Sequence, residues 1–191
     1  MGNLNTVWLA SKSPRRAQLL RDVFPNIVCQ GIEGVDEKPP IGEVEYQVLE
    51  ICKKKARAAD LESQISNYDI VIVCDTMLCD PDDSMLSIGK PVDEIEAAMM
   101  LHRLSGRRHQ VWSATGIKKL AKWKFYCESS IVEIYPLPDE VLVELILSKS
   151  WHGKAGGYDL AGPMSQWAKL IDGSELTVLG IASQALIDLQ Q

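Results

Sequence analysis

The spacing of apolar and polar residues predicts a chain in which strands and helices alternate first and strands pair as hairpins later. The predicted strands are residues 6–9, 26–29, 68–76, 109–117, 123–135 and 167–171. The predicted helices are residues 15–24, 45–64, 93–104, 138–147 and 178–189. In the third helix, the residues expected to face the core are Ile95, Ala98, Met99 and Leu101. This order is typical of an α/β fold with a central mixed sheet flanked by helices, in one domain over residues 1–191.

One predicted strand ends in a carboxylate. Residues 70–74 are apolar throughout, which is typical of a buried strand, and Asp75 and Thr76 follow directly. Ligands of open α/β sheets lie beyond the carboxyl ends of the strands, so Asp75 is a candidate ligand for a metal ion or a water molecule. An aspartate that only caps a turn is the alternative.

The first predicted strand leads into a helix whose start carries positive charge. Ser13 suits the N-cap and Pro14 the first helical position, and two arginines occupy the first turn. Cations at this end oppose the helix dipole, whereas free N–H groups, hydroxyls and guanidiniums together suit a phosphate chain. The alternative is a capped helix with two solvated arginines. The candidate phosphate-binding residues of this turn are Ser11, Ser13, Arg15 and Arg16.

Three further segments lack a helical or strand pattern. Residues 31–40 are a loop that holds glycines, prolines and carboxylates, among them Glu37. Residues 80–87 are polar and are interpreted as a surface loop. Residues 153–162 contain four glycines, which indicates either backbone held close to another group or a flexible loop.

Composition and charge narrow the possible functions. The chain is 46% hydrophobic with a net charge of −6, which argues against a general binder of nucleic acid or of an anionic membrane. No apolar run approaches the roughly 20 residues of a membrane span, and the start has no secretory signal pattern. The five scattered cysteines form no C-x-x-C pair, which favours a reduced, cytoplasmic protein without zinc or disulfides. Any polyanion site must therefore be a local basic pocket.

The charged residues of these segments suggest one chemistry when they are taken together. Glu37 and Asp75 have no histidine or cysteine partners, which favours a hard cation such as Mg²⁺ or Mn²⁺. Lys55, Lys90 and Lys154 beside such a metal would suit a triphosphate that undergoes phosphoryl or nucleotidyl chemistry. For each lysine by itself, a solvated surface position is the alternative.

The order of the motifs also resembles a known family, the Maf family of septum-formation-inhibitor-like proteins. The resemblance covers nearly the whole chain, with the segments in the family's order. The matching segments are Leu9-Ala10-Ser11-x-Ser13-Pro14-Arg15-Arg16, Asp36-Glu37, Lys55-Ala56-Arg57-Ala58, Asp75-Thr76, Gly89-Lys90-Pro91, Leu104-Ser105-Gly106, His109-Gln110-Val111, Lys154-Ala155-Gly156-Gly157-Tyr158 and Gly173-Ser174.

The resemblance implies a fold related to inosine triphosphate pyrophosphatases, with a cleft between two lobes. It implies a nucleoside triphosphate pyrophosphatase that releases the monophosphate and pyrophosphate, usually from non-standard or pyrimidine nucleotides. A divalent metal, a cytoplasmic location and a homodimer are also implied. The residues that take the family's functional positions are Ser11, Arg15, Glu37, Lys55, Asp75, Lys90 and Lys154.

These assignments lead to a mechanistic hypothesis. Ser11, Arg15 and Arg16 hold the phosphate tail at the start of the first helix. Glu37 and Asp75 position Mg²⁺, or Asp75 instead orients the attacking water as a general base. Water attacks the α-phosphorus while the three lysines neutralise the charge that grows on the phosphate oxygens. The preferred nucleobase is not predicted.

Departures from the family pattern leave other functions open. The family usually continues its Lys-Ala-Gly motif to a glutamine, and Ala161 stands in that position. Asp159, two residues earlier, either compensates for the lost amide or repels the phosphates. One alternative is therefore a catalytically weak, nucleotide-binding regulator of the septum-related kind. Another is an enzyme that transfers the nucleotide to an acceptor other than water.

Overall fold

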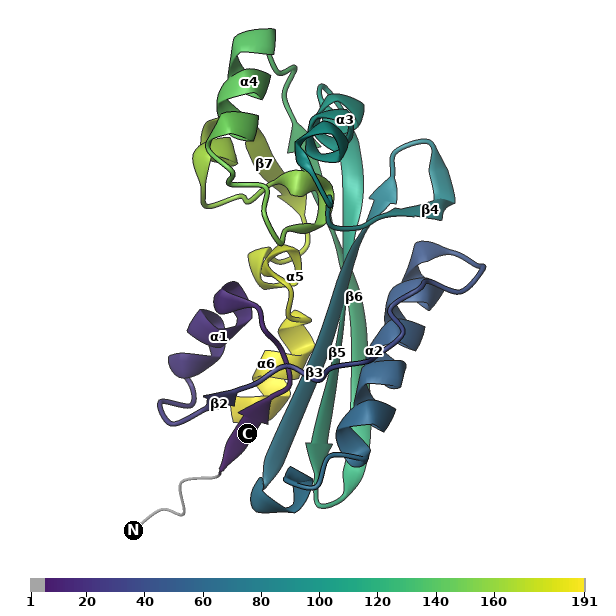
Figure 1. Ribbon diagram of the computed structural model, residues 1–191, viewed down its shortest axis with the longest axis vertical. Coiled ribbons are helices and arrows are strands. Elements are labelled where there is room, and N and C mark those ends of the chain that lie inside the picture. The colour runs from purple at the N-terminus through teal and green to yellow at the C-terminus, as the bar shows by residue number, and fades with distance from the viewer. Residues whose placement is uncertain (1–5, 191) are drawn as a thin grey trace.

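The computed structural model describes residues 6–190 and confirms a mixed sheet flanked by helices (Figure 1). The strands are β1 (Val7–Leu9), β2 (Val28–Cys29), β3 (Ile70–Asp80), β4 (Asp83–Ile88), β5 (Arg108–Lys119), β6 (Lys122–Ile134) and β7 (Ala168–Asp172). The helices are α1 (Pro14–Arg21), α2 (Val44–Asp60), α3 (Glu94–Leu104), α4 (Asp139–Leu147), α5 (Glu175–Leu179) and α6 (Ser183–Gln190). The seven strands follow the order β2-β1-β3-β5-β6-β7, with β4 paired to β3.

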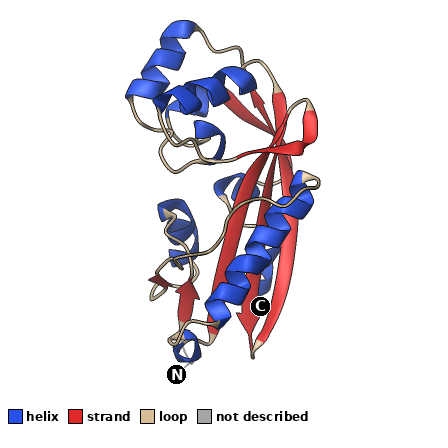
Figure 2. Cartoon of the chain, turned by 45° about the vertical axis from the view of Figure 1, so that its right-hand side comes forward, coloured by secondary structure: helices blue, strands red, loops and turns tan. Residues whose placement is uncertain are grey.

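The central strand β3 is buried because both of its faces are covered by helices. Val71 and Val73 pack in one apolar cluster with residues of α2, which lies over one face of the long strands (Figure 2). Ile70 and Ile72 pack in a second cluster with residues of α1 and α6. The alternation of side chains along a strand thus divides one apolar run between two core regions.

A third apolar cluster fills the other end of the sheet. There the ends of β3, β5 and β6 meet α3, α4 and β7, which form the upper part of Figure 1. Leu101 and Leu104 of α3 are fully buried in this cluster. Because β3, β5 and β6 run through both ends of the molecule, they join the helices of the two parts.

The prediction of a loop over residues 80–87 is wrong, because most of this stretch belongs to a β-hairpin. β3 continues to Asp80, and β4 returns antiparallel to it, with Leu78 opposite Ile88. Asp80 is buried and accepts hydrogen bonds from the Arg103 guanidinium at 2.6 and 2.9 Å. The paired charge offsets the cost of burying an aspartate in a strand. The polar character of the sequence therefore reflects a solvated hairpin rather than a loop.

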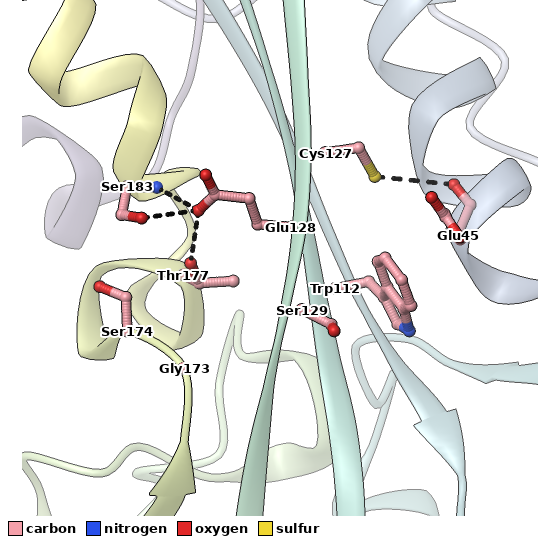
Figure 3. A pocket seen from close by; sticks show the side chains of 9 residues that line it. All are labelled: Glu45, Trp112, Cys127, Glu128, Ser129, Gly173, Ser174, Thr177 and Ser183. Atoms are coloured by element: carbon pink, nitrogen blue, oxygen red, sulfur yellow. Dashed lines mark hydrogen bonds between the residues drawn. The ribbon is translucent and has the colours of Figure 1, made fainter.

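The predicted helix over residues 178–189 is divided into α5 and α6. Gly180 ends α5 in the left-handed conformation, with φ of 108°, and its N–H bonds the carbonyls of Leu176 and Thr177. The second helix is held by Glu128 of β6, which accepts hydrogen bonds from the Ser183 N–H and hydroxyl, both at 2.7 Å (Figure 3). The carboxylate thus satisfies donors at the start of α6.

The prediction for α3 is correct for Leu101 but wrong for Ile95 and Met99. Leu101 is fully buried, whereas the side chains of Ile95 and Met99 are 73% and 67% exposed. Asp93 caps the helix and Ala97 faces the core, so the buried stripe follows Ala97, Leu101 and Leu104. In the described part of the chain, all five cysteines are free thiols, and no helix is long and apolar enough to cross a membrane.

We expect Leu101→Ala to lower the free energy of unfolding by about 2–5 kcal/mol, because it leaves a cavity in the third cluster. Met99→Ala removes a side chain of similar size from the exposed face of the same helix and should cost less than about 0.5 kcal/mol. Urea unfolding of both variants tests this. Equal losses in the two variants would contradict the placement of α3.

Candidate functional site

A cavity of about 850 Å³ brings together every residue that the sequence predicts for the site. It is bordered by the start of α1, the middle of β3, the end of α5 and the loops between elements. The predicted site residues that line it are Ser11, Ser13, Arg15, Arg16, Glu37, Lys55, Asp75, Lys90 and Lys154. Segments far apart in the sequence therefore form one charged cavity.

The cavity opens along an interrupted edge of β3. On this edge, β1 pairs with residues 70–72 and β4 pairs with residues 78–80, while β5 pairs with the opposite edge over residues 70–78. Among residues 6–190, no strand pairs with residues 73–77 on the cavity side. The prediction that β3 ends near Asp75 is wrong, because Asp75 lies in the middle of the strand. The backbone instead becomes accessible where one neighbouring strand stops before the next begins.

Asp75 and Glu37 share one lysine in this gap. The Lys55 ammonium, on α2, donates a hydrogen bond to Asp75 Oδ1 at 2.7 Å and lies 3.1 Å from Glu37 Oε2. Asp75 is only 6% exposed, and no group in the described part of the chain makes a hydrogen bond to its Oδ2 atom. Burial raises the pKa of Asp75, while the nearby Lys55 opposes that rise. The site therefore holds a buried carboxylate with one oxygen still able to bind.

These two carboxylates fit a metal ion whose remaining ligands come from the substrate, rather than a site in which protein side chains supply every ligand. Within residues 6–190, no group of three or more histidine, cysteine, aspartate or glutamate side chains could hold a metal. Mg²⁺ is commonly bound by one or two carboxylates together with substrate phosphates and water. The unpartnered Asp75 Oδ2 beside Glu37 matches that requirement.

The Arg16 guanidinium donates hydrogen bonds to several other groups of the protein. Its Nε donates to the Gly180 carbonyl at 2.8 Å, and its Nη2 donates to the Thr76 hydroxyl at 2.9 Å. Its Nη1 reaches both Ser11 Oγ and the Cys74 carbonyl at 3.4 Å. Any Cβ at Gly180 would lie 2.9 Å from Arg16 Nε, so this approach requires glycine. Arg16 thereby fixes α1 against β3 and the α5–α6 junction.

Arg15, by contrast, faces Asp159 of the glycine-rich segment, residues 153–162. Its Nη1 lies 3.6 Å from Asp159 Oδ2, and Lys154 Nζ lies 3.2 Å from the same oxygen. Lys90 lines the cavity without an ion pair or hydrogen bond to any part of the chain that the structure describes. Burial chiefly lowers the pKa of Lys90, and the nearby Arg16 and Lys55 lower it further. These three cations border the same cavity as the carboxylates.

A buried pair that the sequence did not predict holds the glycine-rich segment in place. His109 Nε2 and the Tyr158 hydroxyl form a hydrogen bond of 2.7 Å, and burial lowers the pKa of His109 to about 4. Gly156 donates its N–H to the Gly89 carbonyl at 2.9 Å, which joins this segment to the one carrying Lys90. The alternation of buried and exposed residues in β5 could have placed His109 in the core.

A second, more open cavity of about 580 Å³ lies beside β6 (Figure 3). One of its two glutamates, Glu128, already accepts hydrogen bonds from Ser183, Gln184 and Thr177. Burial would raise the pKa of Glu128, but these hydrogen bonds lower it overall. Glu128 therefore serves the packing of α6, and the larger cavity is the candidate site.

The fold and the larger cavity define an α/β protein with a basic cavity that also contains a buried carboxylate. Residues 6–191 match the Maf-like protein family, and the chain belongs to that family, which confirms the resemblance seen in the motifs.

Similar proteins include "dTTP/UTP pyrophosphatase" of Bacillus velezensis, 35% identical over 91% of this chain and 88% of the relative. The protein of the same name from Caldanaerobacter subterraneus is 35% identical over 96% of this chain and 86% of the relative. The Ham1 protein of Staphylococcus aureus has a similar structure, with a TM-score of 0.44 and 18% identity over 68% of this chain and 71% of that one.

The two neighbouring arginines should respond differently to substitution. We expect Arg16→Gln to lower the free energy of unfolding by about 1.5–3 kcal/mol, because Gly180 and Thr76 lose charged hydrogen bonds. Arg15→Gln removes one partly exposed ion pair and should cost less than about 1 kcal/mol. Chemical denaturation measures both, and a larger loss for Arg15→Gln would contradict the assignment.

Asp75→Asn should make the protein more stable at pH 7, because the buried carboxylate has a raised pKa. Above that folded-state pKa, Asp75 is ionised in both states and its burial lowers the free energy of unfolding. As the pH falls through that value towards the ordinary 3.8, the cost disappears and the two proteins should converge. Thermal unfolding at several pH values tests this, and a less stable variant at pH 7 would refute it.

Proposed function

We propose that this chain is a nucleoside triphosphate pyrophosphatase, which hydrolyses its substrate to the nucleoside monophosphate and pyrophosphate. The observation that carries the proposal is the buried Asp75, which Lys55 bridges to Glu37. The same cavity is lined by Arg15, Lys90 and Lys154, which can bind phosphate oxygens. Membership of the Maf-like family supports the same conclusion. Because its relatives are named dTTP/UTP pyrophosphatases, we propose pyrimidine nucleoside triphosphates as substrates.

Substrate binding would depend on the cations around the cavity. Arg15, Lys90 and Lys154 supply donors for phosphate oxygens, and Ser11 and Ser13 border the same space at the start of α1. Arg16, held by its internal hydrogen bonds, keeps this helix start in position. The predicted role of Arg16 as a direct phosphate ligand stays a prediction.

The chemical step would use the two carboxylates. Asp75 Oδ2 is the free acceptor that can take a proton from the attacking water, while Oδ1 stays on Lys55. The oxygen of that water forms a bond to the α-phosphorus, and the bond from phosphorus to the bridging oxygen of pyrophosphate breaks. Lys90 and Lys154 offset the negative charge of the departing pyrophosphate.

Glu37 and Asp75 are the residues that would hold a divalent metal such as Mg²⁺ or Mn²⁺, and in that alternative role Asp75 Oδ2 binds the metal instead of accepting the proton. When bound, the metal would polarise phosphate oxygens and so stabilise charge in the transition state. The homodimer and the cytoplasmic location implied by the family resemblance stay predictions.

Asp75→Asn should lower kcat by about 10²–10⁴-fold, because it removes the proposed proton acceptor while keeping the size of the side chain. Pyrophosphate release from a panel of nucleoside triphosphates with Mg²⁺ measures this, and the unfolding experiment above shows that the variant is folded. Near-normal turnover by Asp75→Asn would contradict the assignment.

The same panel separates hydrolysis from the two alternatives. A regulator would bind nucleotide without release of pyrophosphate in the wild-type protein. A transferase would release pyrophosphate only when an acceptor other than water is present. Hydrolysis in buffer with Mg²⁺ alone supports the proposal.

A further inference from the structure

The cavity contains a carboxylate at a position where a phosphate ligand would be expected. Asp159 Oδ2 lies 3.2 Å from Lys154 Nζ and 3.6 Å from Arg15 Nη1, so one oxygen contacts both cations. The other oxygen, Oδ1, accepts the Ala161 N–H at 3.2 Å. The Asp159 side chain is only 12% exposed. This arrangement differs from a solvated surface ion pair and needs an explanation within the site.

A carboxylate oxygen and a phosphate oxygen form the same kind of ion pair with a guanidinium and an ammonium group. Asp159 Oδ2 therefore contacts Arg15 and Lys154 as one oxygen of a bound phosphate would. Burial lowers the pKa of Arg15, and the nearby Asp159 raises it again, so the carboxylate compensates a cation that is partly removed from water. If Asp159 were absent, the ligand-free protein would hold Arg15 and Lys154 as two neighbouring positive charges.

We propose that Asp159 is an internal counterion that the phosphate chain of the substrate displaces. It pairs with Arg15 and Lys154 in the ligand-free protein, releases them to the incoming triphosphate, and pairs with them again as pyrophosphate leaves. Asp159 thereby weakens phosphate binding and favours product release. This inference rests on the proposed function only in assuming that phosphates occupy the cavity.

A purely positioning role for Asp159 predicts the opposite effect on binding. If the carboxylate only held Arg15 and Lys154 in the correct orientation, its loss would leave both side chains unrestrained and lower their affinity for phosphate. If it competes with phosphate, its loss makes the two cations available at no cost. The sign of the change in affinity therefore distinguishes the two roles.

The test compares Asp159→Asn with Asp82→Asn. Asp82 also contacts two cations, Arg103 and Arg107, but it lies at a more exposed position outside the cavity, so its replacement removes the same charge from a two-cation bridge that cannot touch the ligand. Calorimetry with inorganic pyrophosphate as the probe measures binding without turnover, and steady-state assays with UTP give KM and kcat. Pyrophosphate inhibition of UTP hydrolysis gives a further measure of product affinity.

For Asp159→Asn we expect pyrophosphate to bind about 3- to 30-fold more tightly, with a similar fall in KM and stronger product inhibition. Asp82→Asn should match the wild type in all three measurements. Unchanged or weaker pyrophosphate binding by Asp159→Asn would overturn the inference. Asp159→Ser, which also removes the charge, gives the same readout if the asparagine variant does not fold.

The two proposals can fail separately. Tighter pyrophosphate binding by Asp159→Asn in a protein that hydrolyses no nucleoside triphosphate would support the counterion and refute the enzyme. Hydrolysis by the wild type with no gain of affinity in Asp159→Asn would support the enzyme and refute the counterion.

Discussion

The candidate site depends on the interruption of one edge of β3. A strand edge exposes backbone donors and acceptors that another group must satisfy. Where β1 has ended and β4 has not begun, the Cys74 carbonyl is instead contacted by Arg16 at 3.4 Å and by Lys55 at 3.5 Å. The gap thus draws two cationic side chains to the middle of the sheet, and the cavity forms beside them.

The same gap explains why a carboxylate can be buried at Asp75. Val71, Val73 and Met77 lie on the same face of β3 as Asp75 and pack against α2. Asp75 therefore occupies a position that packing alone would fill with an apolar residue. Lys55 supplies an opposite charge from α2, but one carboxylate oxygen stays without a partner. Such a group lowers stability and is typical of sites that keep binding capacity for a ligand.

The sequence predicted which residues line the cavity better than it predicted the strands and loops that form it. Short motifs around Ser11, Asp75 and Lys154 combine residue types with an evident chemistry, so these residues could be found without coordinates. The position of Asp75 in the middle of β3 could not be predicted from the sequence, because it depends on where β1 and β4 end. The contact of Asp159 with Arg15 was equally hidden, since it joins a loop to α1 across a long stretch of sequence.

Arg15 and Arg16 show why adjacent residues of one motif need the fold to be told apart. Successive side chains in a helical turn leave the helix about 100° apart, so two neighbouring arginines at a helix start meet different neighbours. Arg16 meets the open edge of β3 and becomes part of the framework, whereas Arg15 forms an ion pair with Asp159. A charge pattern predicts a basic pocket, but the neighbours of each side chain decide which cation is available to a ligand.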